Sequence, residues 1–210
     1  EKRSQMMIGI LSRVVERRNG ETSTHVQHIR TLTGMLLDHL AQKTGRYPLT
    51  QEMRRTISMA SVLHDIGKME IGEHVLNSPE PRTPEEEEAM RQHTLLGARM
   101  LEELDAYRDE DFVRVAYQIC RWHHERYDGS GYPDQLKGEQ IPIAAQVVGL
   151  ADAYETLITG GGSQPPVPHA AAVQMLCTAE AGVFNPLLLD CLQEIEAEID
   201  TAMRREPEGL

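Results

Sequence analysis

The sequence predicts an all-α protein, a bundle of about eight helices. Apolar residues recur every three or four positions through most of the chain, and no segment alternates apolar and polar residues long enough to form a strand. Only 4% of the residues are aromatic, so the core must be built from Leu, Ile, Val, Met and Ala, which favours packed helices. A chain of 210 residues has the length of one domain and can bury a core without disulfide bonds.

Breaks between the expected helices are easy to recognise. The Gly-rich and Pro-rich stretches over 77–84, 127–142 and 160–166 are expected to be loops. Thr50 can cap one helix, and Thr83-Pro84 with Glu86 has the form of a capping box with proline at the first helical position. The predicted helices lie over 1–18, from Thr22 or Ser23 to the turn at Gly45, from Thr50 towards Gly67, from Thr83 to about Leu104, and over 111–125, 143–158, 169–181 and 185–204.

The charge balance disfavours several classes of function. There are 33 acidic and 21 basic residues, so the net charge is −12 and the pI is about 5.2. Nucleic-acid binding needs a basic face, and anionic membranes also attract basic proteins, so neither DNA nor a membrane surface is an expected partner. No apolar stretch approaches the roughly 20 residues of a membrane span, and no signal peptide is visible.

Cysteine usage and the first residue give expectations about compartment and domain organisation. Cys120, Cys177 and Cys191 are too widely spaced for a disulfide framework or a CxxC metal site, so a reducing, cytoplasmic environment is expected. The chain begins with Glu1 instead of Met, which indicates a piece of a longer protein. We expect a linker helix over 1–19, one domain over 20–204 and a short tail over 205–210.

Four histidines extend the apolar faces of four different predicted helices: His25, His64, His93 and His124. A fifth, His123, directly precedes His124 at the start of a Gly-rich loop. A single histidine on an apolar face is usually a core residue with a hydrogen-bond partner, and each of the four fits that interpretation when taken alone. One shared metal centre accounts for all four, because buried imidazoles need partners and bundles build metal sites from facing helices.

Carboxylates accompany these histidines. Asp65 follows His64 within a predicted helix, where aspartate is unfavourable unless it is paired or bound to metal, and its two oxygens can bridge two ions. Asp152 lies on a helix flank that a solvated carboxylate would also occupy, and Glu21 is equally explained as a favourable charge at a helix start. A donor set of imidazoles and carboxylates suits Fe, Mn, Zn or Ni and does not select among them.

Two blocks of the sequence resemble the signatures of a known family. His64-Asp65-Ile66-Gly67-Lys68 resembles the signature of the HD superfamily of metal-dependent phosphohydrolases. The stretch HHERYDGSGYP over 123–133 resembles the second signature of its HD-GYP branch, and GEQIP over 138–142 and Ala151-Asp152 follow it as in that branch. The blocks stand about 60 residues apart in the family's order, and the resemblance covers roughly residues 20–192.

The resemblance implies an HD-domain-like helical bundle with a metal site in its core. Two or three divalent ions are implied, with iron or manganese favoured and zinc or nickel as options. Asp65 and Lys68 are implied as catalytic residues, Lys68 through contact with a phosphate. The implied metal ligands are Glu21, His25, His64, Asp65, His93, His123, His124 and Asp152. The implied substrate contacts are Lys68, Gly131, Tyr132 and Glu155.

The implied activity is hydrolysis of cyclic di-GMP to pGpG, to GMP or to both, by the output domain of a cytoplasmic signalling protein. Members of this family usually carry the domain behind a sensor or receiver domain, and their GYP loops are implicated in contacts with diguanylate cyclase domains. The partners implied are the cyclic dinucleotide, an upstream domain, such a cyclase and a second copy in a homodimer.

One segment departs from the family pattern. The family commonly has Arg-x-Tyr-Lys after the Asp-containing helix, where basic residues grip the dinucleotide, whereas here residues 159–166 read TGGGSQPP and no Arg or Lys occurs between Lys137 and Arg204. Two alternatives therefore stand beside cyclic di-GMP hydrolysis. The chain could hydrolyse another cyclic dinucleotide or phosphoester, or it could be a catalytically weak module that acts through protein partners.

Overall fold

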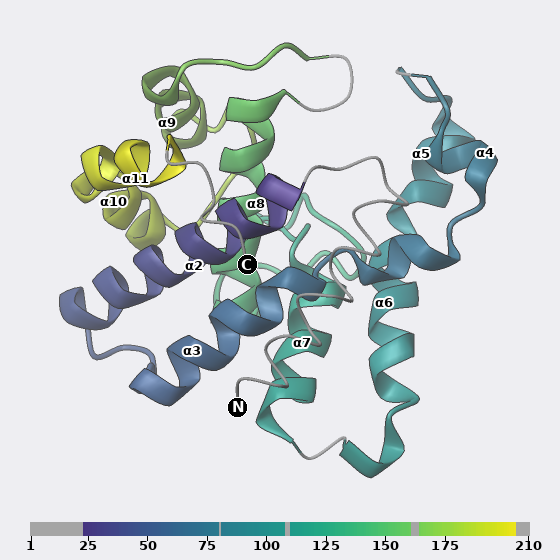
Figure 1. Cartoon of the computed structure of the whole chain (residues 1–210), viewed down its shortest axis with the longest axis horizontal. Coiled ribbons are helices and arrows are strands. Elements are labelled where there is room, and N and C mark those ends of the chain that lie inside the picture. Colours follow the sequence, from purple (N-terminus) through teal and green to yellow (C-terminus); the bar gives the residue numbers. More distant parts are fainter. Residues whose placement is uncertain (1–22, 80, 108–109, 161–163, 205–210) are drawn as a thin grey trace.

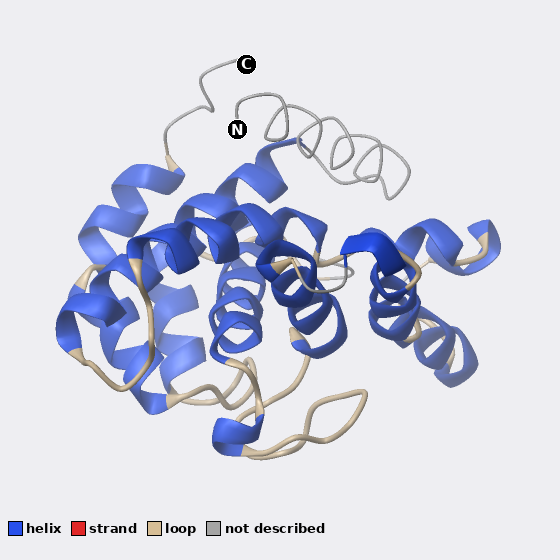
Figure 2. Ribbon diagram, turned by 90° about the horizontal axis from the view of Figure 1, so that it is seen from below, coloured by secondary structure: helices blue, strands red, loops and turns tan. Residues whose placement is uncertain are grey.

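The computed structural model describes residues 23–79, 81–107, 110–160 and 164–204. The predicted helix over 1–18, the boundary at 19, the tail over 205–210 and the candidate ligand Glu21 lie outside these residues. Within them every regular element is helical, as the sequence analysis predicts, and none is a strand (Figure 2). No helix in the described part of the chain is both long and apolar enough to cross a membrane.

The helices vary in length from one turn to more than five turns. Short 3₁₀ turns, of which Ser61–Leu63 and Ile66–Glu70 matter most for the site, connect some of them. The α-helices are α2 (Ser23–Lys43), α3 (Gln51–Ala60), α4 (Glu73–Leu76), α5 (Pro84–Arg91), α6 (His93–Glu102), α7 (Asp111–Trp122), α8 (Ile143–Thr159), α9 (His169–Cys177), α10 (Pro186–Glu194) and α11 (Glu196–Met203).

Four helices, α2, α3, α7 and α8, surround the main apolar core (Figure 1). On α2 the side chains of Leu32, Leu36 and Leu40, spaced four apart, are fully buried. They pack in one cluster with Leu150 and Tyr154 of α8. In Figure 1, α9, α10 and α11 lie on one side of this centre, and α4 and α5 project on the other.

Local signals in the sequence locate the helix starts. The Thr50 side chain accepts a hydrogen bond from the backbone N–H of Met53, which confirms it as an N-cap. Thr83 and Glu86 form the predicted capping box in front of α5, with Pro84 at its first position. The ends are less well predicted: the helix expected over 185–204 breaks at Ile195 into α10 and α11, where the sequence offers neither Gly nor Pro.

The helix expected to carry His64 and Asp65 ends before them. After Ala60 the chain tightens into a 3₁₀ turn, so the doublet occupies a turn between two 3₁₀ segments instead of a helix interior. Asp65 has φ −102° and ψ 11°, outside the α-helical region. The helical spacing of apolar residues persists through this segment, so the spacing alone predicts a continuous helix, but aspartate and the following Gly67 are poor helix formers.

Two glycines let the elements of this region approach closely. A Cβ on Gly67 would lie 1.9 Å from the backbone oxygen of His93, so the 3₁₀ turn can contact the start of α6 only without a side chain there. A Cβ on Gly149 would lie 2.2 Å from the backbone oxygen of His123, which brings α8 against the end of α7. Both contacts are made with the backbone of a histidine singled out by the sequence.

We expect Gly67→Ala and Gly149→Ala each to lower the free energy of unfolding by about 1–3 kcal/mol or more, because backbone atoms must move to admit the methyl group. Gly45→Ala is the matched control, since a Cβ at Gly45 meets nothing within 4 Å. Its effect should stay within about 1 kcal/mol. Urea unfolding followed by circular dichroism measures all three, and equal stabilities would contradict the packing argument.

Candidate metal centre

The predicted donor residues come from five places in the chain and meet beside the core. His25 lies on α2, and His64 with Asp65 occupies the turn after α3. His93 is the first residue of α6, His123 and His124 follow the last turn of α7, and Asp152 lies on α8. His64, His93 and His123 are at most 2% exposed. Within the described residues, the structure therefore places the predicted metal ligands beside one another, with Asp152 next to the compact donor groups and outside them.

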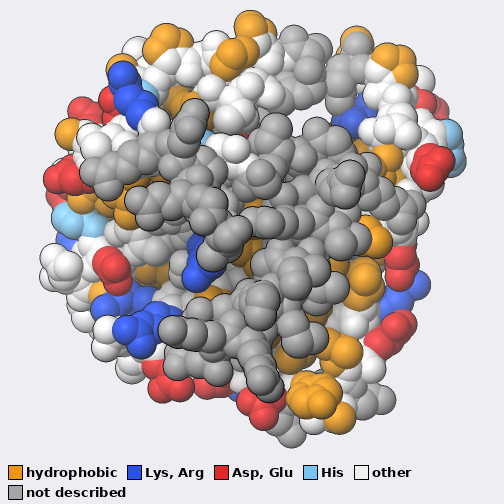
Figure 3. Space-filling view, in the orientation of Figure 1, with side chains coloured by type: hydrophobic (Ala, Val, Ile, Leu, Met, Phe, Trp, Pro, Cys, Tyr) orange, Lys and Arg blue, Asp and Glu red, His pale blue; other side chains and the backbone are white. Residues whose placement is uncertain are grey.

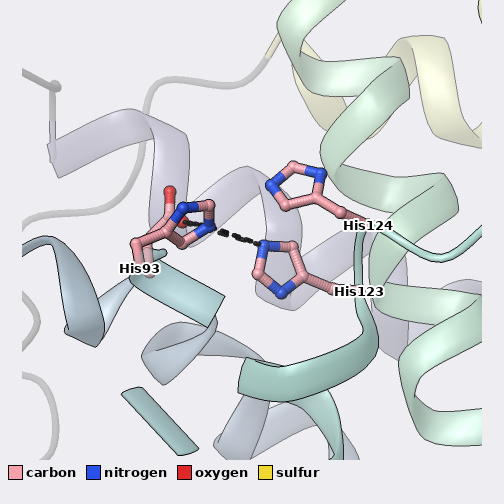
Figure 4. A group of neighbouring side chains, drawn as sticks. His93, His123 and His124 are labelled. Atoms are coloured by element: carbon pink, nitrogen blue, oxygen red, sulfur yellow. Dashed lines mark hydrogen bonds and ion pairs between the residues drawn. The ribbon is translucent and has the colours of Figure 1, made fainter. Parts of the chain in front are cut away.

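Their ligand atoms form two groups, each compact enough to hold one ion. Asp65, His93, His123 and His124 make one group, and His25, His64 and Asp65 make the other, with the atoms of each group within 4.8 Å of one another. We call these the four-donor group and the three-donor group. Figure 4 shows the three histidines of the four-donor group turned towards a common point. Asp65 belongs to both groups, so its carboxylate can bridge two ions as the sequence analysis predicts.

Backbone carbonyls orient three of the histidine rings. The Nδ1 atoms of His64, His93 and His123 lie 2.9, 2.7 and 2.9 Å from the carbonyl oxygens of Ser61, Met90 and Ile119, which are three or four residues earlier in the chain. A carbonyl oxygen only accepts, so each Nδ1 must carry a hydrogen and donate it. In the neutral ring this leaves Nε2 with a lone pair, which is the form that binds a metal.

These lone pairs face one another, which is unfavourable unless a cation lies between them. The Nε2 atoms of His93 and His123 are 3.4 Å apart, and Asp65 Oδ1 lies 3.1 Å from the first and 3.7 Å from the second. Three acceptors at these distances have no hydrogen to share when both rings are neutral. Among the described residues, His25 Nε2 and Asp65 Oδ1 also have no hydrogen-bond partner, and both atoms are buried. The residues present thus fit a cluster of metal ions.

Burial favours the neutral, metal-binding form of His123 and His124, and a nearby charge favours the ionised form of Asp65. The pKa values of His123 and His124 are held well below the usual range, chiefly because burial disfavours the charged ring and also because neighbouring histidines repel it. Burial alone would raise the pKa of Asp65, but the nearby charge of Lys68 holds it well below its usual value. Neutral imidazoles and an ionised carboxylate are the states that metals require.

Lys68 places a positive charge beside the donor groups. Its Nζ lies 2.6 Å from Asp65 Oδ2, on the carboxylate that belongs to both donor groups. The side chain is 19% exposed, so the ammonium group is held at the edge of the centre.

Asp152 lies beside these two groups. Its Oδ1 is 3.9 Å from His64 Nε2, and its side chain is 15% exposed. Burial raises the pKa of Asp152, and the neighbouring charge of Asp65 raises it further while His64 acts in the opposite direction. Helical periodicity alone is equally consistent with a position of Asp152 on a solvent-exposed side of its helix. In the structure, α8 packs along α2, and this side of α8 lies next to His64.

Glu155 lies in a different environment from the one the resemblance implies. As a substrate contact it would need an accessible carboxylate, but it is 1% exposed. Its Oε2 accepts a hydrogen bond from His25 Nδ1, and its Oε1 lies 3.5 Å from His28 Nδ1. Burial alone would raise the pKa of Glu155, but the hydrogen bonds and charges of His25 and His28 lower it to about 2. The Glu155 side chain is buried because it lies on the side of α8 that faces α2.

Gly131 and Tyr132, the other implied substrate contacts, are both packed against the α7 end. A Cβ on Gly131 would lie 2.4 Å from backbone atoms of Glu125 and Arg126, so Gly131 is a packing position and is buried. The ring of Tyr132 stacks on that of His124, with centroids 4.8 Å apart and planes at 23°. The guanidinium of Arg91 lies over the Tyr132 ring, 5.0 Å from its centroid.

Sequence reasoning missed the residue that fixes this loop. Glu125 is 5% exposed, and its carboxylate accepts hydrogen bonds from the backbone N–H groups of Asp134 and Leu136 at 2.7 and 3.0 Å. These bonds hold the loop that carries Tyr132 against the end of α7. The available signal was a charged residue directly after the His123-His124 pair, a place where neither helix periodicity nor turn chemistry requires one.

Comparison with known proteins gives consistent matches. The family model for the HD domain matches residues 5–186. The chain is 32% identical over 95% of its length to the cyclic di-GMP phosphodiesterase response regulator RpfG of Xanthomonas campestris, and 32% identical, again over 95%, to a cyclic di-GMP phosphodiesterase of Thermotoga maritima. It is also 31% identical over 91% to 3'3'-cGAMP-specific phosphodiesterase 2 of Vibrio cholerae. The chain spans 50%, 51% and 34% of these relatives, respectively.

Solved structures share the fold. A cyclic GMP-AMP-specific phosphodiesterase of Vibrio cholerae superposes with a TM-score of 0.67 at 17% identity, over 96% of this chain and 51% of that one. Bd1817, an HDG"Y"P protein from Bdellovibrio bacteriovorus, superposes with a TM-score of 0.59 at 23% identity, over 83% and 53%. The family model and these relatives together show that the chain belongs to the HD domain family, in its HD-GYP branch.

Proposed function

We propose that this chain is a metal-dependent phosphodiesterase that hydrolyses cyclic di-GMP to pGpG, to GMP or to both. The observation that carries the proposal is the membership of Asp65 in both donor groups, because one carboxylate then joins two cation sites. Paired cation sites of this kind suit displacement at a phosphate, where attacking and leaving oxygens both need stabilisation. The relatives named as cyclic di-GMP phosphodiesterases support the substrate class.

The proposed metal ligands come from both donor groups and from their neighbours. His25, His64, His93, His123, His124 and Asp152 would hold the ions, together with Asp65 between them, and Glu21 belongs to the same proposed ligand set. Iron or manganese is the proposed metal, and zinc or nickel also fits this donor set. When bound, the ions would supply Lewis acidity that polarises the phosphate and makes water a better nucleophile.

Lys68 is the residue proposed to face the phosphate directly. Its ammonium group lies at the edge of the centre and already contacts the shared carboxylate. From there it can stabilise negative charge on a phosphoryl oxygen as water adds to phosphorus and the bond to the ribose oxygen breaks. This position matters because the chain carries a net charge of −12 and has no Arg or Lys between Lys137 and Arg204.

A second substrate deserves a direct comparison. Three curated relatives in Vibrio cholerae are named as 3'3'-cGAMP-specific phosphodiesterases, and this chain lacks basic residues in the segment over 159–166. Hydrolysis of 3'3'-cGAMP is therefore the second candidate function.

The proposed setting is a longer, cytoplasmic signalling protein. The chain spans about half of its first curated relatives, and one of them is named as a response regulator. Cys120, Cys177 and Cys191 are free thiols, as a reducing compartment favours. An upstream sensor or receiver domain, a diguanylate cyclase domain contacting the loop around Tyr132, and a homodimer are part of the same proposal.

Asp65→Asn should abolish turnover of both cyclic dinucleotides and lower the number of metal ions bound, because an amide keeps the shape but removes the charge that joins the two sites. The assay separates nucleotide products after incubation with anaerobically prepared, Mn²⁺-loaded or Fe²⁺-loaded protein, and elemental analysis gives the metal content. Asp38→Asn is the control, because Asp38 is exposed and its Oδ1 pairs with Arg54 Nε at 2.7 Å, away from the donor groups. A wild-type protein that binds metal but leaves both dinucleotides intact would contradict the proposed activity.

Lys68→Gln should slow turnover about 10- to 100-fold while the metal content stays near that of the wild type, since it removes one charge-assisted contact to phosphate and no ligand. Steady-state kinetics with the preferred dinucleotide measures the effect. Lys43→Gln is the matched control. Lys43 also pairs with a carboxylate, that of Glu194, but this pair lies on the protein surface. Equal rates for the Lys68 and Lys43 variants would remove Lys68 from the mechanism.

A further inference from the structure

We infer that Glu155 is a positioning residue that selectively strengthens the three-donor group by orienting His25 and increasing the basicity of its ring. The inference deepens the proposed function, since it concerns how that centre is filled. The Nδ1 atom of His25 donates a hydrogen bond to Glu155 Oε2. The opposite ring atom, Nε2, is buried and has no hydrogen-bond partner among the described residues, which leaves it as the atom that His25 can offer to the three-donor group.

The carboxylate itself is firmly held. Glu155 is 1% exposed, and the hydroxyl of Thr159, one helical turn later, lies 3.3 Å from its Oε2. On the other side His28, one turn after His25 on α2, places Nδ1 3.5 Å from Oε1. The carboxylate thus lies between two imidazoles of α2. Both imidazoles can stabilise a buried carboxylate in this position.

His25 differs from the other histidines in the group that orients its ring. His64, His93 and His123 are each oriented by a neutral backbone carbonyl from their own segment of chain. Among these four ligands, His25 alone is oriented by a charged side chain, and that side chain comes from another helix. A carboxylate partner fixes the tautomer and raises the basicity of the ligating nitrogen, and removing such a partner typically costs about 10- to 100-fold in metal affinity.

The four-donor group has no comparable dependence. Within the described part of the chain, none of its members forms a hydrogen bond or ion pair with Glu155; they are Asp65, His93, His123 and His124. Loss of the Glu155 charge should therefore weaken one class of metal site and leave the other nearly unchanged. A general loss of structure would weaken both.

The test is Mn²⁺ titration of metal-free protein by isothermal titration calorimetry, with thermal unfolding of each metal-free variant measured by circular dichroism. The wild type should show a tighter and a weaker class of sites. Glu155→Gln keeps the shape and removes the charge, so the weaker class should lose about 10- to 100-fold in affinity. Glu194→Gln is the matched control, because Glu194 pairs with His39 of the same helix α2 at 2.6 Å, but on the surface.

A double-variant comparison separates positioning from general stability. His25→Ala should itself weaken the weaker class, and adding Glu155→Gln to it should cause no further change. If Glu155→Gln does not fold, Thr159→Val removes a hydroxyl that bonds the Glu155 backbone oxygen at 2.8 Å and lies 3.3 Å from the same carboxylate, and it should weaken that class by about 2- to 10-fold.

Three results would overturn the inference. Unchanged Mn²⁺ affinities in Glu155→Gln would do so while leaving the proposed function intact, and so would an equal loss in both classes. A wild-type protein that binds no Mn²⁺ and no Fe²⁺ would overturn the inference together with the proposed metal centre.

Discussion

The centre depends on a set of buried lone pairs that point at one another. His93 and His123 are fixed as Nδ1–H tautomers by carbonyls of their own segments, so their Nε2 atoms meet across 3.4 Å with Asp65 beside them. Such an arrangement is costly in a buried place unless cations occupy it. The same burial keeps the pKa values of His123 and His124 low, so protons do not readily take the place of the metal.

Much of the local structure follows from the need to bring these atoms together. The chain leaves the α-helical conformation at His64 and Asp65, which directs two successive side chains into the same centre. Because Gly67 has no side chain, this turn can contact α6. Because Gly149 has none, α8 can contact the end of α7. Glu125 fixes the loop that lays Tyr132 on His124. These features have little to do with core burial, and they concentrate where the donors meet.

Sequence patterns predict the parts of this structure that depend on local chemistry. The cap at Thr50 and the capping box at Thr83 depend on residues within one turn, and both are confirmed. The turn at His64 is not predicted, because the apolar spacing that indicates α3 continues through it and the reason to leave the helix lies on other helices. Asp152 could be assigned only through the family resemblance, since its periodicity fits solvent equally well. The partner of Glu155 lies 130 residues away, a contact that no single-sequence pattern encodes.

The two donor groups differ in what holds them, and this difference bears on how the centre can vary. The rings of His93 and His123 are oriented by backbone carbonyls, which no substitution of a partner side chain removes. The ring of His25 is oriented by Glu155, and a single substitution can shorten, neutralise or delete that carboxylate. Two histidines of the four-donor group are therefore held by the fold itself, whereas one histidine of the three-donor group depends on a side chain of α8. A helical domain of this design can change how strongly the three-donor group would hold an ion without repacking its core.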